Sequence, residues 1–434
     1  MVASVFMDDF IILRHKLPFD FYYYYLIYAL SIIYYLNSSG SIKLLPRWFL
    51  ASISLIVFST LIVTFIEDAY TLSVTKQLIG LFFSSIAYYT FLSYNNFEIR
   101  RIFKMYVYLA FLVAAEGLLE EVLNIVGIHI NDKMKLTTAG FYRIYGIMGE
   151  PYFLASSLIP AMYFAFYKTT IFEKILSNYK NITILGAIAT CFIFTFSSAS
   201  FLGIGAIIFF WLYNKKYLSF TSWKIILLPF FVIALGIGFA NIQKSWSEFN
   251  IKYTQTLTAF SNNNTSKKEV TVLNSSSFAL YSNYVIAKHS FESWPLTGTG
   301  IGTHEANYKK YFSLFFDKDF LIRYGAFNMA DANSLFIRLL SETGFLGLSL
   351  FFIFMFRFLL LKKGYEYPEL RDYLLVNQGI FILFVIRLIR TGNYFGNGFF
   401  LFFFIYYLSY KIVNKRISER KNQKREMIVP QIIK

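Results

Sequence analysis

Long apolar runs separated by short polar clusters make up most of the hydropathy pattern of the 434-residue chain. A helix needs roughly 20 mostly apolar residues to cross a bilayer. Eleven segments meet or approach this requirement: 19–36, 48–66, 72–93, 102–127, 149–168, 182–197, 199–214, 223–243, 335–361, 372–390 and 396–413. The pattern therefore predicts an all-α polytopic integral membrane protein with about 11–12 transmembrane helices.

Basic clusters between the apolar runs predict how the helices are oriented. The strongest cluster is KIVNKRISERKNQKR at 411–425, which the positive-inside rule assigns to the cytoplasm. Counting back through the spans places four further basic stretches on the same side: 361–372, 214–224, 167–180 and 96–104. Arg14, His15 and Lys16 run against this count, so we expect either a short additional helix near residues 3–14 or an error of one in the number of spans.

The same count leaves the longest polar segment, 244–334, on the outer side of the membrane as a large loop domain between late helices. Residues 278–294 within it have the pattern of an amphipathic helix. The chain is thus predicted to contain five parts: N-terminal spans (1–140), middle spans (141–243), the loop domain (244–334), C-terminal spans (335–413) and a basic cytoplasmic tail (414–434).

Composition supports a membrane protein and excludes several functional classes. Charged residues are 15% of the chain, against about a quarter in soluble domains. The net charge of +16 is divided among clusters rather than gathered in one patch. We therefore predict that the chain contacts the lipid bilayer and does not bind nucleic acid. Cys191 is the single cysteine and the four histidines lack ligand spacing, so we predict no metal and no cofactor. No phosphate-loop motif is present, which argues against an ATP-driven pump.

Ionisable residues close to the spans are the main functional candidates, because they are costly there. The first group lies in FYRIYGIMGEPYFLASS (141–157). Pro151 suits a first helical turn. Glu150 before it either favours the positive end of the helix or is a catalytic residue. Capping does not explain Arg143, whose guanidinium beside glycines suits bidentate binding of phosphate or carboxylate.

The second group is in IRLIRTGNYFGNG (386–398), at the predicted outer end of the penultimate span. Arg387 and Arg390 are three residues apart and share a helix face. They either extend to lipid headgroups or bind an anionic ligand at the outer leaflet, and the second interpretation is favoured. Inside span 102–127, Glu116 and Glu120 also share a face, and mark either a cation path or the outer end of that helix.

The third group belongs to the loop domain and the helix that re-enters the membrane. Its members are His304, Glu305, Arg323, Asp331, Asn333, Arg338 and Glu342. Arg338 and Glu342 have the spacing of an ion pair that neutralises itself on one helix face. His304 and Glu305 are either an ordinary surface pair or the source of a general base with a pKa tuned by burial.

Two of these stretches, PLTGTGIGTHEANY (295–308) and DANSLFIRLLSETGFLGLSLF (331–351), resemble the shared region of the O-antigen polymerase and O-antigen ligase superfamily of bacterial envelope proteins. In that family a P-x-x-G-x-G-x-G turn ends the large periplasmic loop, and an N-x-x-(L/F)-x-x-L-x-E-x-G-x-x-G helix follows. The matching residues here are Pro295, Gly298, Gly300, Gly302, Asn333, Glu342, Gly344 and Gly347. RIYGIMGEP (143–151) and SSASFLGIGAIIFF (197–210) resemble two more family elements, so the resemblance covers residues 140–352.

The resemblance implies a GT-C-like fold and metal-independent transfer of an undecaprenyl-pyrophosphate-linked glycan to an acceptor at the periplasmic face of the bacterial inner membrane. Arginines would hold the pyrophosphate: Arg143, Arg387 and Arg390, with Arg323 and Arg338 as further candidates. Either His304 or Glu305 would deprotonate the attacking hydroxyl or hold the acceptor. The remaining candidates for sugar contacts are Tyr308, Asn333, Gly300 and Gly302, and a chain-length regulator and a flippase of the same pathway are expected partners.

One departure from the family separates the possible reactions. Family ligases carry a histidine immediately before the motif asparagine, where this chain has Ala332, preceded by Asp331. Either Asp331 substitutes for that histidine or the chemistry is that of the polymerases, so we favour polymerase over ligase. A lipid-linked oligosaccharide transporter or flippase, and a peptidoglycan glycosyltransferase of the shape-and-division type, remain as alternatives.

Overall fold

The computed structural model describes residues 1–7, 11–13, 21–39, 42–67, 72–128, 142–170, 179–215, 217, 275–316, 328–361, 367–396 and 398–428. The predicted span 223–243, much of the predicted loop domain, and Arg323 lie outside the described residues.

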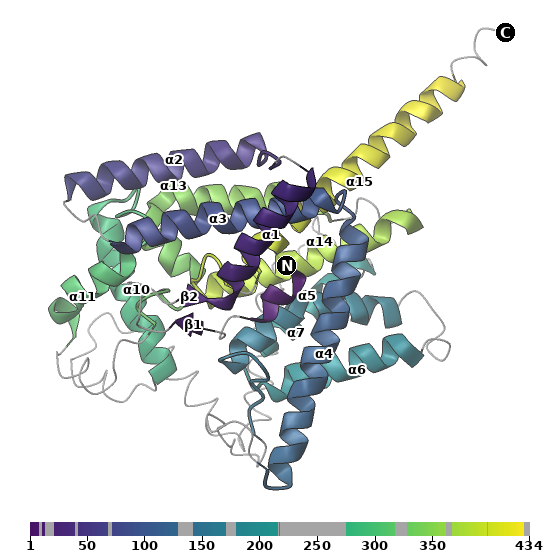
Figure 1. Cartoon of the computed structure of the whole chain (residues 1–434), viewed down its shortest axis with the longest axis horizontal. Helices are drawn as coiled ribbons and strands as arrows, with labels where there is room; N and C mark the ends of the chain where they lie inside the picture. The colour runs from purple at the N-terminus through teal and green to yellow at the C-terminus, as the bar shows by residue number, and fades with distance from the viewer. Residues whose placement is uncertain are drawn as a thin grey trace.

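Helices make up nearly all of the described chain (Figure 1). They are α1 (Tyr23–Ser39), α2 (Arg47–Ile66), α3 (Leu72–Tyr94), α4 (Ile99–Ile125), α5 (Pro151–Thr170), α6 (Tyr179–Phe194), α7 (Ser198–Asn214), α10 (Ser275–Ser293), α11 (His304–Phe315), α13 (Leu335–Arg357), α14 (Arg371–Ile389) and α15 (Phe399–Ile428), with two 3₁₀ helices, η1 (Val2–Phe6) and η6 (Pro368–Leu370). Each predicted span that falls on described residues coincides with one of these helices, and the amphipathic segment 278–294 coincides with α10. A small antiparallel pair, β1 (Ile11–Leu13) and β2 (Phe21–Tyr22), departs from the all-helical prediction.

By length and composition, four of the described helices can cross a membrane: α2, α4, α13 and the continuous stretch Pro368–Ile389. Helices α6 and α7 are apolar but shorter. Large apolar side chains of α2 and α13 are exposed, among them Phe58, Phe65 and Phe345. Such faces suit contact with lipid, so the described chain has the character of a helical membrane protein.

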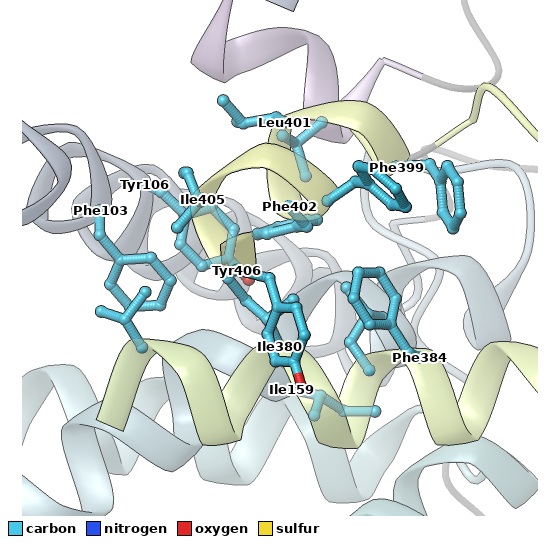
Figure 2. Close-up of a cluster of buried hydrophobic side chains, with 14 of the residues drawn as sticks. Phe103, Tyr106, Ile159, Ile380, Phe384, Phe399, Leu401, Phe402, Ile405 and Tyr406 are labelled. Atoms are coloured by element: carbon cyan, nitrogen blue, oxygen red, sulfur yellow. The ribbon is translucent and has the colours of Figure 1, made fainter. Parts of the chain in front are cut away.

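Helix α14 forms the centre of the bundle and packs against α5, α7, α13 and α15. In Figure 2, Ile380 and Phe384 of α14 face Phe402 and Tyr406 of α15 across the core. Phe354 of α13 stacks on α15 with a centroid distance of 3.9 Å to Phe403. The core is therefore built from aromatic rings, which accounts for the high phenylalanine and tyrosine content.

Two amides of α14 hold polar groups inside this core. Asn377 accepts from the Leu360 amide at 2.7 Å and donates to the Phe358 and Tyr406 carbonyls at 3.0 Å. It thereby satisfies backbone groups at the end of α13. Gln378 accepts from the side chain of Asn214 at 2.7 Å, which ties α14 to α7.

The N-terminal residues are part of the core. Val2, Val5 and Phe6 of η1 are buried, and the Ser4 hydroxyl lies 2.8 Å from that of Tyr88 in α3. In the region 3–14, where a short helix is one of two expectations, the described residues form the 3₁₀ helix η1 and the strand β1. At the other terminus, α15 continues into the basic tail as far as Ile428, and its C-terminal part projects from the bundle at the upper right of Figure 1.

Candidate functional site

The glycine turn, defined as Pro295–Gly302, is inserted into a break in α13. Gly344 has φ 57° and ψ −152°, which interrupts the helix. The amide of Phe345 therefore donates to the carbonyl of Pro295, at 2.9 Å. The amide of Leu346 donates to the carbonyl of Leu296, also at 2.9 Å.

The same insertion supplies hydrogen-bond donors to the α13 carbonyls that lose their helical partners at the break. In an unbroken helix the carbonyls of Ser341 and Glu342 would accept bonds from residues four positions later. Here the Ser341 carbonyl accepts from the Thr299 amide at 3.0 Å, and the Glu342 carbonyl accepts from the Gly300 amide at 2.9 Å. The turn thus replaces one helical turn of hydrogen bonds, and the two stretches that carry the family resemblance interlock.

Gly300 and Gly302 bring the turn against α2 and α3. A β-carbon at Gly300 would lie 2.8 Å from Thr64 Cγ2, and one at Gly302 would lie 2.8 Å from the Ser73 carbonyl oxygen. Both glycines have positive φ, 104° and 84°. In this structure, Gly300 permits close approach to the threonine side chains of α2, and Gly302 permits close approach to the backbone of α3.

His304 begins α11 and is completely buried. Its Nε2 lies 2.9 Å from Asn283 Oδ1, and its Nδ1 lies 3.0 Å from the Ser341 hydroxyl. Because Asn283 Nδ2 donates to the Ala279 carbonyl, its Oδ1 is the acceptor, so His304 carries its proton on Nε2. Burial, followed by the charge of Arg338, lowers the pKa of His304 to about 3. The ring is therefore neutral, and it joins α10, α11 and α13.

The residues that follow His304 face in different directions. Tyr308 is buried and donates to the Ser282 hydroxyl at 2.8 Å, and burial raises its pKa to about 12. Glu305 lies at the surface and pairs with Lys309 at 2.6 Å. His304 therefore lies in the interior and joins three helices, whereas its neighbour Glu305 lies at the surface.

Arg338 and Glu342 form the ion pair predicted from their spacing. The Arg338 Nε lies 3.1 Å from Glu342 Oε1, and both side chains are almost fully buried. Tyr394 donates to Glu342 Oε2 at 2.8 Å, and its ring lies 4.2 Å from the guanidinium carbon of Arg338. Arg338 also donates to the Gly392 carbonyl at 2.8 Å. The pair therefore ties α13 to the loop between α14 and α15.

The segment before α13 lies across the end of α14. Ala332 and Asn333 both have positive φ, 57° and 56°, and Asn333 is buried. The Asn333 carbonyl accepts from the Thr391 amide at 3.2 Å, and Asp331 Oδ1 accepts from the Asn333 amide at 3.0 Å. Burial raises the pKa of Asp331, although backbone hydrogen bonds and Arg338 oppose this. A β-carbon at Gly392 would collide with the Asp331 carbonyl oxygen, so only glycine fits there.

The two arginines at the end of α14 have different environments. Arg387 is 1% exposed, donates to the Gly396 carbonyl at 2.7 Å and lies 5.2 Å from the centroid of the Phe399 ring. It fixes the start of α15. Arg390 is only partly buried by its surface area, and it lies within electrostatic range of the Glu150 carboxylate and the Tyr152 hydroxyl.

Tyr152 interacts electrostatically with several of the predicted residues. Its hydroxyl lies within electrostatic range of four charged groups: Asp331, Arg387, Glu150 and Arg390. These come from three separate stretches of sequence, around residues 150, 331 and 390. We call them the Tyr152 cluster. Sequence reasoning missed Tyr152 and Tyr394, and only their positions beside the charged motifs could have drawn attention to them.

Arg143 lies to one side of this cluster, at the turn between α6 and α7. Its Nε and Nη2 both lie 3.4 Å from acceptors, the carbonyls of Thr195 and Phe196. The acidic run of α4 supports the same segment, because Glu121 accepts from the Tyr142 amide at 2.9 Å and Glu116 accepts from the Ile147 amide. The carboxylates of α4 thus accept hydrogen bonds from the backbone on both sides of Arg143, at residues 142 and 147. Among the described residues, no group of histidine, cysteine and acidic side chains could hold a metal ion.

No protein-family model matches the chain, and no curated protein is significantly similar to it in sequence. The resemblance to the O-antigen polymerase and ligase superfamily therefore depends on the quoted motifs, and the activity that it implies is a proposal.

Proposed function

We propose that this chain is a membrane glycosyltransferase that polymerises undecaprenyl-pyrophosphate-linked repeat units at the periplasmic face of the bacterial inner membrane. The Tyr152 cluster carries the proposal. It gathers two arginines and two carboxylates at one end of a lipid-suited helical bundle, beside the two interlocked motifs of the resemblance. In this orientation α10 and α11 lie on the periplasmic side and the basic end of α15 lies in the cytoplasm.

The arginines divide into two kinds, which gives each a role. Arg338 and Arg387 are buried and donate to backbone carbonyls, so they fix the loop between α14 and α15. Arg390 and Arg143 are partly exposed, so they can reach the diphosphate of a lipid-linked donor. Guanidinium groups held on such a fixed support stabilise the charge of a departing diphosphate without having to reorganise.

The reaction breaks one bond and forms one. A hydroxyl oxygen of the acceptor glycan attacks the anomeric carbon of the donor sugar, and the bond from that carbon to the pyrophosphate oxygen breaks. The electron pair leaves with undecaprenyl pyrophosphate, which Arg390 and Arg143 stabilise. Asp331 takes the hydroxyl proton, because a carboxylate whose pKa is raised by burial is a stronger base. His304 is neutral and buried, so it positions α11 in this scheme, and Glu150 balances the charge of Arg390.

The direct test uses the purified full chain in lipid nanodiscs. It is incubated with lipid-linked repeat units extracted from the source organism, and the products are separated by size. A ladder with steps of one repeat supports the polymerase. Transfer of a single unit to a separate acceptor identifies a ligase, and movement of the lipid across a sealed bilayer without a new glycosidic bond identifies a transporter; either result replaces the proposal.

A further inference from the structure

A second polar site lies at the opposite end of the bundle, where α2 begins and α3 ends. It is a cleft of about 560 Å³. Its lining residues are Pro46, Arg47, Trp48, Tyr89, Phe97, Tyr407, Leu408 and Lys411. The glycine turn touches Thr60 and Thr64, near the other end of α2, so this cleft is separate from the glycine turn.

The charge of the cleft is entirely positive. Arg47 and Lys411 are exposed, and neither pairs with a carboxylate in the described part of the chain. Lys411 lies 5.7 Å from the centroid of the Tyr407 ring, which keeps the ammonium group at the edge of the cleft. The nearest acid along the chain from a lining residue, Glu98, already pairs with Arg101 at 3.7 Å. The cleft therefore offers its positive charge to an external anion.

Aromatic rings form a fixed wall beside these cations. The Trp48 indole packs against Tyr407 at 4.9 Å and Phe354 at 5.4 Å between centroids. Its buried Nε1–H has no hydrogen-bond partner among the described residues. A buried donor without a partner costs free energy unless a ligand or water satisfies it.

We propose that this cleft binds the phosphodiester of an anionic glycerophospholipid. Arg47 and Lys411 contact the phosphate oxygens, and the aromatic wall holds the glycerol ester region, as is common for interfacial tryptophan and tyrosine. The acyl chains lie along α2, whose exposed apolar side chains Leu55, Phe58 and Ile62 continue from the cleft toward the middle of the helix. The site lies in the basic end of the bundle, so it faces the leaflet from which anionic lipids attract Lys and Arg. The inference does not depend on the proposed glycosyl transfer.

The test compares two double variants of the full chain in detergent. Arg47→Gln with Lys411→Gln removes the two cations of the cleft. Lys104→Gln with Lys415→Gln removes the same charge from two exposed side chains at the same end of the bundle and leaves the pair of Glu98 and Arg101 intact. Binding of short-chain phosphatidylglycerol, measured by native mass spectrometry, is expected to weaken about tenfold or more in the cleft variant and less than about twofold in the control.

Three results of the binding measurement would overturn the site. Equal weakening in both variants would show a general attraction between charges, and equal binding of phosphatidylcholine would show that anionic charge is not recognised. Full competition by inorganic phosphate would show a site for a free anion rather than for a lipid. A fluorescence measurement gives an independent readout: brominated phosphatidylglycerol is expected to quench the wild type more than the Trp48→Phe variant, which retains the other four tryptophans. Equal quenching would place the lipid elsewhere.

Discussion

The backbones of Gly298 and Gly344 pack so closely that neither position has room for a side chain. A β-carbon at Gly298 would lie 2.6 Å from the Gly344 nitrogen, and a β-carbon at Gly344 would lie 2.5 Å from the Gly298 nitrogen. Both residues have positive φ, 64° and 57°. The two glycines of different motifs are therefore required by a single backbone contact, the insertion of the glycine turn into α13.

We expect Gly298→Ala to destabilise the protein by about 2–5 kcal/mol, because it adds backbone collision to left-handed strain. The matched control is Gly186→Ala in α6, where a β-carbon has nothing within 4 Å. Alanine at that helical position is expected to be neutral or slightly stabilising. Thermal unfolding in detergent measures both. Similar unfolding temperatures for the two variants would contradict the insertion.

The helices could be predicted from the sequence, whereas this insertion could not. An apolar run of about 20 residues needs only its own composition to indicate a buried or lipid-facing helix, so the positions of α2, α4 and α13 agree with the predicted spans. The glycine turn was visible as a motif. Its contact with Ser341 and Glu342 joins residues some forty positions apart, and no local periodicity records such a pairing.

The buried pair of Arg338 and Glu342 predicts strong coupling. Glu342→Gln leaves the Arg338 guanidinium buried without its counterion, a change expected to cost about 3–5 kcal/mol. Arg338→Met alone leaves the Glu342 carboxylate buried without its counterion, and a similar cost is expected. The double variant is expected to be more stable than the sum of the two single losses implies. A double-mutant cycle by denaturant unfolding measures this, and additive losses would show that the pair contributes no coupling energy.

Substitution of Arg387 is expected to lower the stability of the protein, whereas substitution of Arg390 is expected to lower its activity with little change in stability. Arg387→Ala removes a buried donor from the Gly396 carbonyl and should lower the free energy of unfolding by about 3 kcal/mol. Arg390→Gln should change it by less than about 1 kcal/mol, because the side chain is partly exposed. If Arg390 stabilises the diphosphate, the same variant should slow ladder formation about tenfold to a thousandfold.

Arg101→Gln is the matched control for Arg390→Gln, since it removes an exposed arginine from the opposite end of the bundle. A normal ladder from Arg390→Gln would remove this residue from the proposed reaction. Loss of both stability and activity in that variant would instead indicate a structural arginine.

The split between these arginines also shows what sequence patterns leave out. Arg387 and Arg390 share a helix face and both suggested an anion site. Arg387 donates to backbone carbonyls, which every residue type has, so the sequence does not identify these partners. The bend that brings Gly396 back to α14 depends on tertiary packing and is not encoded by a local pattern. In the same way the spacing of Arg338 and Glu342 predicted their pair but not the third member, Tyr394.

His304 predicts a pH dependence of stability. The pKa of its ring is lowered from 6.5 to about 3 by burial, so between these values the unfolded chain binds a proton that the folded chain excludes. The stabilisation is complete above pH 6.5 and is lost as the pH falls toward 3, at about 1.4 kcal/mol per pH unit. Between pH 7.5 and 5 the wild type should lose about 2 kcal/mol from this group. His304→Gln, although less stable at pH 7.5, should lack that part of the slope.

Tyr308→Phe is the matched control, because it removes a hydrogen bond from the same joint between α10 and α11 without removing a group that titrates in this range. It should be less stable than the wild type at every pH but keep the wild-type slope. Unfolding free energies at pH 7.5, 6.5, 5.5 and 5 in one detergent, at constant ionic strength, measure all three proteins. Parallel curves for the wild type and His304→Gln would mean that the imidazole takes up its proton in the folded protein near its ordinary pKa of 6.5, and the neutral hydrogen-bonded joint described for His304 would then be wrong.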